Sequence, residues 1–166
     1  MFDENRLKHT MQVSNIMEEN AKNLGLNPED MFTLGFLHDI GYKFGDGSNH
    51  HIVGAKMLEQ QGYKYYKEVR YHGMPTDEYS SIELDLLNFA DMQVTRQGKK
   101  VSLEERLDEI SARNGEDSII TKNCRQVVDG LYKKYHIIGS KIALRDLKKT
   151  AHNTALAHDD NTPSIN

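Results

Sequence analysis

Residues 34–41 read Leu34-Gly35-Phe36-Leu37-His38-Asp39-Ile40-Gly41. This stretch places a histidine and an aspartate inside an apolar run of the kind that forms a buried helix. It follows Asn27 and Pro28, a side-chain cap and a first-turn proline, so we expect a helix from there to about Gly41. Burying an ionised aspartate without a partner costs several kcal/mol. Because the run contains no lysine or arginine, the partner should be a histidine or a metal ion.

The overall composition indicates one globular domain: the chain has 166 residues, of which 37% are hydrophobic and 28% charged. No run reaches the roughly 18 apolar residues of a spanning helix, and residues 1–6 lack an apolar secretion signal, so we expect a cytoplasmic protein without membrane contact. Cys124 is the only cysteine, which excludes an intrachain disulfide and a thiolate-rich metal site. The net charge of −4 gives no basic surface for duplex nucleic acid but leaves a small anionic ligand open.

Apolar residues recur at helical spacing along most of the chain. Caps and stop signals divide it into seven expected helices, at residues 4–24, 27–41, 50–61, 65–72, 82–94, 102–115 and 117–135. No stretch alternates as a strand does, so the sequence predicts an all-α bundle of about seven helices. A last helix is expected over residues 140–157, ahead of a frayed tail. We therefore predict a helical domain at residues 1–138 and a C-terminal helix and tail at residues 139–166.

Several histidines fall where they can face the interior of one bundle. They lie on or at the ends of the first four expected helices: His9, His38, His51 and His72. A second aspartate, Asp91, lies in another apolar run, at residues 86–92. Imidazole and carboxylate ligands together suit manganese, iron, cobalt, nickel or zinc, whereas magnesium and calcium prefer more oxygen. The sequence thus predicts a site for divalent transition-metal ions.

Five short segments resemble motifs of the HD-domain superfamily of metal-dependent phosphohydrolases. They are Lys8-His9-Thr10, Leu37-His38-Asp39-Ile40-Gly41-Tyr42, His51-Ile52-Val53-Gly54-Ala55, Tyr71-His72-Gly73 and Phe89-Ala90-Asp91. The resemblance covers roughly residues 5–110 and implies an HD-like helical bundle. It also implies metal ligands, which are His9, His38, Asp39 and Asp91 for one ion, with His51 and His72 for a second. Asp39 would bridge the two ions, and the pattern is most similar to small bacterial HD hydrolases, including the branch that splits diadenosine tetraphosphate symmetrically.

The resemblance implies an activity as well as a fold. It is hydrolysis of a phosphate ester or anhydride of a small, nucleotide-like substrate by a metal-activated water, with Asp39 as the central catalytic carboxylate. We favour one or two ions of iron or manganese, with zinc, cobalt or nickel as alternatives. Lys43, five residues after His38, and Arg96, five residues after Asp91, are candidates to hold phosphate oxygens at the mouth of the site.

Some alternatives stay open from the sequence. His50 competes with its neighbour His51 for one ligand position, and His72 could simply end a helix, which would leave a one-metal site. The same ligands serve a diiron oxygenase, and the domain could also bind metal and nucleotide as a regulatory module without turnover. Lys43 and Arg96 could be ordinary solvated charges. A second copy of the chain, in a homodimer, is a further candidate partner.

Overall fold

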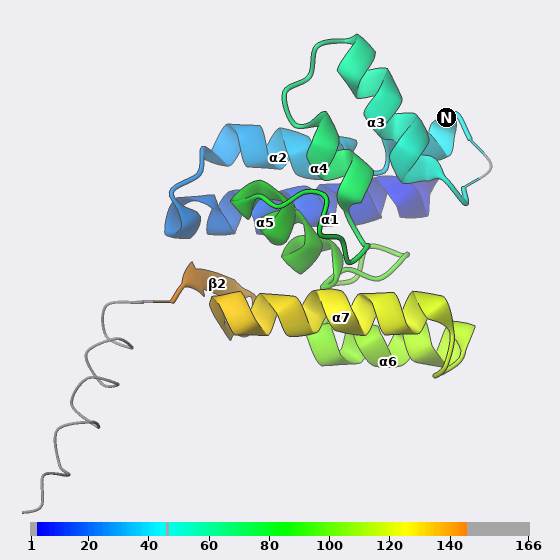
Figure 1. Cartoon of the computed structure of the whole chain (residues 1–166), viewed down its shortest axis with the longest axis vertical. Coiled ribbons are helices and arrows are strands. Elements are labelled where there is room, and N and C mark those ends of the chain that lie inside the picture. The colour runs from blue at the N-terminus through cyan, green and yellow to red at the C-terminus, as the bar shows by residue number, and fades with distance from the viewer. Residues whose placement is uncertain (1–2, 46, 146–166) are drawn as a thin grey trace, which may run out of the picture.

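The computed structural model describes residues 3–45 and 47–145, which fold into seven α-helices, two 3₁₀ turns and one small sheet (Figure 1). The helices are α1 (Glu4–Ala21), α2 (Pro28–Leu37), α3 (His50–Gln60), α4 (Tyr66–Tyr71), α5 (Ile82–Asp91), α6 (Leu103–Asn114) and α7 (Ile119–Lys134). The 3₁₀ turns are η1 (Lys22–Leu24) and η2 (Ile40–Lys43), and the strands are β1 (Tyr135–Ile138) and β2 (Lys141–Leu144). The predicted all-α bundle of about seven helices is confirmed. Among the described residues, no helix is both long and apolar enough to cross a membrane.

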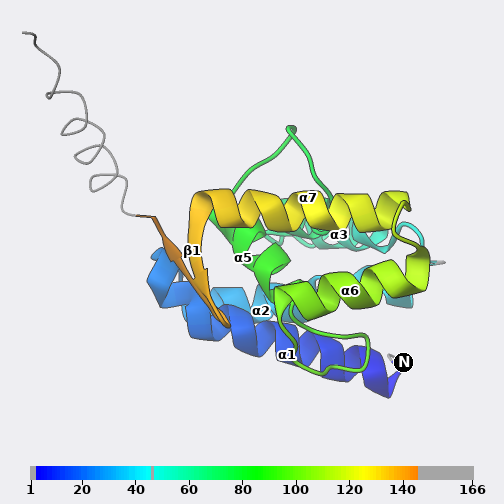
Figure 2. The same cartoon turned by 90° about the horizontal axis from the view of Figure 1, so that it is seen from below.

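Helix α1 is the centre of the bundle and packs against α2 and α5. Helices α6 and α7 lie side by side as a second layer, which both views show (Figures 1 and 2). The core between these elements is made of fully buried side chains, among them Val13, Ile16, Met17, Met31, Leu34, Leu86, Leu87 and Phe89. Because these residues come from α1, α2 and α5, the three helices that carry His9, His38 and Asp91 share one rigid core.

Side-chain caps fix where five of the helices begin. The capping residues are Asp3, Asn27, Ser81, Ser102 and Ser118, each of which accepts a hydrogen bond from a backbone N–H of the first turn. The predicted cap at Asn27 is confirmed, and Ser102 and Glu105 form a capping box at the start of α6. These caps satisfy N–H groups that have no partner within the helix.

Helix α2 ends earlier than the sequence predicts. It stops at Leu37 instead of about Gly41, and the chain continues through His38 and Asp39 into η2. In η2 the backbone approaches that of α3 closely, and a Cβ on Gly41 would collide with the carbonyl oxygen of His50 and the amide of Gly54. This contact fixes Asp39 against the start of α3.

A β-hairpin follows α7, and here the prediction of no strand is wrong. Strand β1 pairs antiparallel with β2, and Gly139, with a φ of +57°, makes the turn. The side chain of Asn20 in α1 holds β2, since its Oδ1 accepts from the Ile142 amide and its Nδ2 donates to the Ser140 carbonyl. The helix predicted over residues 140–157 is therefore wrong at residues 141–144, and residues 146–166 lie outside the described part. The hairpin also spans the predicted boundary at residue 138.

Candidate metal centre

His38 occupies the end of α2 and is completely buried. Its Nδ1 donates to the carbonyl of Gly35 at 2.6 Å, which leaves Nε2 as the nitrogen that can bind a metal ion once it carries no proton. Nε2 lies 3.4 Å from Asp39 Oδ1 and 3.7 Å from Asp91 Oδ1, and it has no hydrogen-bond partner among the described residues. A buried acceptor nitrogen facing two carboxylates is stable only with a cation or a proton between them.

Three more histidines, which lie on other elements, are also held through Nδ1 and also turn Nε2 towards a carboxylate. The Nδ1 atoms of His9, His50 and His72 each lie within 3.1 Å of a backbone carbonyl, those of Thr95, Gly47 and Val69. Each Nε2 then faces a carboxylate: that of His9 is 3.1 Å from Asp91 Oδ1, and those of His50 and His72 are 3.4 and 3.7 Å from Asp39 Oδ1. A hydrogen bond from Nδ1 to a backbone carbonyl is one of the usual ways in which proteins orient histidine ligands of a metal.

Asp39 lies between two groups of histidines. Its Oδ1 faces His38, His50 and His72, while its Oδ2 lies 3.7 Å from His9 Nε2. Two sets have ligand atoms that all lie within 4.8 Å of one another, and His38 belongs to both: His9, His38 and Asp91, and His38, Asp39 and His72. The donor set and the unpartnered nitrogen of His38 fit a divalent transition metal.

The pKa values of these groups are shifted by burial and by the charges of their neighbours. Burial disfavours charge on Asp39, but the charge of His38 together with the hydrogen bond and charge of His72 outweighs it and holds the pKa of Asp39 well below its usual range. Burial also lowers the pKa of His9, but the hydrogen bond to Asp91 and the charges of Asp91 and Asp39 together reverse this, so the net pKa is raised. Burial and the nearby His72 lower the pKa of His50 to about 4, which leaves that ring neutral and able to act as a ligand near pH 7.

The structure separates the two adjacent histidines at the start of α3. His50 brings Nε2 to within 3.4 Å of both Asp39 Oδ1 and His72 Nε2. The ring of His51 lies further out, with its centroid 5.5 Å from that of His50 and 6.4 Å from that of His72. The geometry therefore favours His50 for the ligand position that the sequence analysis gave to His51, and the role of His51 stays a prediction.

A cavity of about 400 Å³ opens onto the cluster. Residues of α1, η2, α3, α5, α6, α7 and the neighbouring loops line it: Arg6, His9, Asp39, Tyr42, His50, His51, His72, Met74, Asp91, Arg96, Arg106, Arg113 and Ile120 among them. The predicted phosphate ligand Arg96 is in this set. The other, Lys43, is exposed with its Nζ 5.5 Å from the centre of the Phe44 ring, and it is not among the described residues that line the cavity.

Three arginines of this cavity were not predicted from the sequence. Arg6 stacks on Tyr42 and pairs with Asp39, its Nη1 lying 2.5 Å from Oδ2. Its position three residues before His9 places it on the same face of α1, and this spacing could have predicted from the sequence that Arg6 lies near the site. Arg106 and Arg113 come from α6, where they look like surface charges in the sequence.

Comparison with known families identifies the family of this chain. The model of the HD domain family matches residues 6–120, more than half of the chain. The chain belongs to the HD-domain superfamily. Searches of curated proteins and of solved structures found no match. HD domains are in general metal-dependent phosphohydrolases that bind divalent ions, and the His and Asp groups of this HD domain are able to hold such ions.

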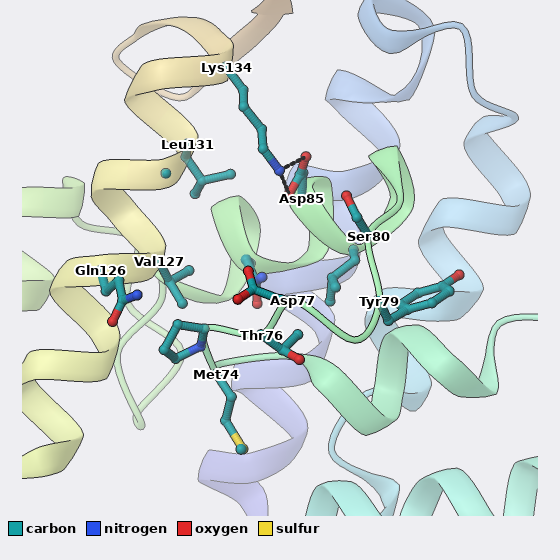
Figure 3. Close-up of a pocket in the computed structure, with 14 residues that line it drawn as sticks. Met74, Thr76, Asp77, Tyr79, Ser80, Asp85, Gln126, Val127, Leu131 and Lys134 are labelled. Carbon is teal, nitrogen blue, oxygen red and sulfur yellow. Dashed lines mark hydrogen bonds and ion pairs between the residues drawn. The ribbon is translucent and has the colours of Figure 1, made fainter.

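A second cavity of this HD domain, of about 190 Å³, lies between the loop at residues 74–80 and helices α5 and α7 (Figure 3). Met74 lines both cavities. Lys134 and Asp85 form an ion pair at 3.3 Å at one end of it (Figure 3), and Asp85 also accepts a hydrogen bond of 2.6 Å from Tyr135. The charged groups at this end already stabilise one another.

Proposed function

We propose that this HD domain hydrolyses a phosphate ester or anhydride of a small, nucleotide-like substrate with the help of two divalent ions, iron or manganese. One observation carries the proposal: four histidines, each fixed through Nδ1 by a backbone carbonyl, present Nε2 to Asp39 and Asp91. A core histidine with a structural role needs no such convergence, whereas metal ligands do. The symmetric cleavage of diadenosine tetraphosphate is one reaction within this class.

The ligands divide between two ions. His9, His38 and Asp91 would hold the first ion, and His50 and His72 the second. Asp39 would serve both, because its two oxygens face different histidines. Bound divalent ions lower the pKa of a coordinated water towards about 7 and neutralise charge on phosphoryl oxygens.

Two arginines of the cavity have supporting roles, one toward the carboxylate of Asp39 and one toward the substrate. Arg6 holds Asp39 in its ionised form, and its stacking on Tyr42 keeps the guanidinium beside that carboxylate. Arg96 lines the same cavity and is exposed, which suits a side chain that binds phosphate oxygens from solution. We leave Lys43 out of this set because it lies outside the described lining of the cavity.

The test combines elemental analysis with an activity assay. We expect about two metal ions per wild-type chain, about one in His72→Ala and close to none in Asp39→Ala. With manganese added, the wild type should release phosphate or a phosphorylated product from at least one member of a nucleotide panel. The Asp39→Ala variant should lose this activity by at least about 100-fold, since even the outer partners of metal ligands contribute 10–100-fold.

His136 provides a matched control, because it is an exposed histidine on β1. The His136→Ala variant should keep both ions and full activity. Two ions with no turnover of any phosphorylated compound would favour a regulatory binding module instead. A wild-type chain that binds no metal under any loading condition would contradict the proposal.

A further inference from the structure

Arg106 is charged yet buried, with 8% of its surface exposed. Its Nη1 donates to Glu109 at 2.5 Å, but its Nε has no hydrogen-bond partner among the described residues. A buried guanidinium N–H is rarely left without an acceptor in native proteins unless a ligand or water supplies one. Since Arg106 lines the cavity of the metal centre, that acceptor can come from a bound substrate.

Glu109 connects Arg106 to a second arginine. One carboxylate oxygen of Glu109 accepts from Arg106 and the other accepts from Arg113 Nη1 at 3.1 Å. The three residues lie on one face of α6, and Glu109 neutralises only one of the two guanidinium charges. This arrangement holds two forked donors in place and leaves a net positive charge beside the cavity.

A third arginine, Arg96, adds to this charge. Burial lowers the pKa of Arg113, and the charges of Arg96 and Arg106 lower it further, so the three guanidinium groups repel one another. An anion placed among them relieves this repulsion. The cavity of about 400 Å³ falls within the 300–1,000 Å³ range of ligand pockets, so it accommodates a ligand larger than a single phosphate next to the metal ligands.

We propose that Arg106 and Arg113, bridged by Glu109, form a second anion subsite that binds the next phosphoryl group of the substrate. The enzyme then selects compounds with two or more linked phosphoryl groups over monophosphates. This inference rests on the proposed function for the place of the first phosphoryl group, at the metal centre. It assigns substrate selection to α6, which contributes none of the candidate metal ligands.

The test compares two non-hydrolysable probes, methylenediphosphonate and methylphosphonate, by calorimetric titration of the manganese-loaded protein. Metal content is measured before and after each titration. We expect the wild type to bind the diphosphonate more tightly than the monophosphonate. Arg113→Ala and Arg106→Lys should each reduce this preference by about tenfold, the loss expected for one charge-assisted hydrogen bond, while binding of the monophosphonate changes little.

Arg125 provides the matched control, because it is an exposed arginine of α7 that pairs with Glu116 outside the cavity. The Arg125→Ala variant should keep the wild-type preference. Arg113 has 35% of its side chain exposed, so its variant tests the subsite even where a change at buried Arg106 disturbs folding. Metal-loaded, folded Arg113→Ala that retains the full preference would overturn the inference, as would a wild type without any preference. Neither result needs turnover, so a failure of the subsite is distinct from a failure of the proposed hydrolysis.

Discussion

Two cavities of this domain, the smaller of about 190 Å³ and the larger of about 400 Å³, share Met74 but differ in how their polar groups are satisfied. In the smaller cavity, Asp85 accepts from Tyr135 and pairs with Lys134, so these charges stabilise one another (Figure 3). At the larger cavity, two buried nitrogens have no hydrogen-bond partner in the described structure: Arg106 Nε in its lining, and His38 Nε2, which lies 3.4 Å from the lining carboxylate of Asp39.

This difference separates a structural polar cluster from a binding site. A protein that buries polar groups normally pairs them internally, because each unpaired group costs free energy. Unpaired groups that gather in one cavity indicate that a ligand completes them. The larger cavity has two such places, one among the histidines and one on α6, and the smaller cavity has its ion pair in place without a ligand.

The largest expected effect concerns His50 and tests the metal side of this comparison. Replacing His50 by alanine removes the ring whose Nε2 lies 3.4 Å from Asp39, so we expect the loss of one ion per chain and at least about 100-fold of the activity. His51→Ala should keep both ions and reduce activity far less than His50→Ala, because the His51 ring lines the cavity outside the cluster of ligand atoms. Elemental analysis and initial rates of the two variants show which of the two histidines is the metal ligand. The opposite pattern would establish His51 as the ligand.

The next effect concerns the backbone contact that supports this site. Gly41→Ala forces a methyl group against the His50 carbonyl, and we expect it to destabilise the metal-free fold by about 1–3 kcal/mol and to weaken metal binding. Denaturant unfolding and metal titration measure the two effects.

Gly130 provides the control, since it lines the smaller cavity in α7 and an added Cβ there would contact nothing. Gly130→Ala should raise stability by about 0.5–1 kcal/mol because alanine favours the helix, with no change in metal affinity. Equal effects of the two substitutions would show that the contact at Gly41 has no special role.

The sequence predicts much of this fold because its helices are long, amphipathic and capped by their own residues, such as Asn27 and Ser102. It does not predict the hairpin, since two strands of four residues carry little alternation and β2 depends on Asn20, more than a hundred residues away. The choice between His50 and His51 fails for a related reason. Both lie at the first turn of α3, where the apolar spacing of the helix says little about orientation, and the deciding contact with Asp39 is a tertiary one.

A moderate effect is expected at the wall between the two cavities. The Oδ1 of Asn88 accepts from the Gly73 amide at 2.8 Å, directly after His72. Asn88→Ala leaves this amide without its acceptor, so we expect about 1 kcal/mol of lost stability and a reduced affinity for the ion held by His72. Competition with a metal chelator measures that affinity.

Gln126→Ala serves as the control for Asn88→Ala, because Gln126 is exposed and lines only the smaller of the two cavities. It should leave both stability and metal affinity at their wild-type values. Unchanged chelator competition in Asn88→Ala would mean that His72 is held by its bond to the Val69 carbonyl alone.

The smallest effect concerns the paired charges of the second cavity and depends on pH. Burial, and then the hydrogen bond to Asp85, raise the pKa of the Tyr135 hydroxyl above its ordinary value. The neutral hydroxyl is favoured in the folded state, so its contribution to stability is complete below about pH 10, the ordinary tyrosine pKa, and is lost as the pH rises towards the higher folded-state value. Tyr135→Phe should therefore be less stable than the wild type at pH 8 by about 1 kcal/mol, and the difference should shrink above pH 10. Thermal unfolding of both proteins at pH 8 and pH 10.5 measures this. A constant difference would mean that the hydroxyl contributes through packing and not through its bond to Asp85. Metal binding at neutral pH should be the same in both proteins, because Tyr135, Asp85 and Lys134 are paired with one another without the metal ions.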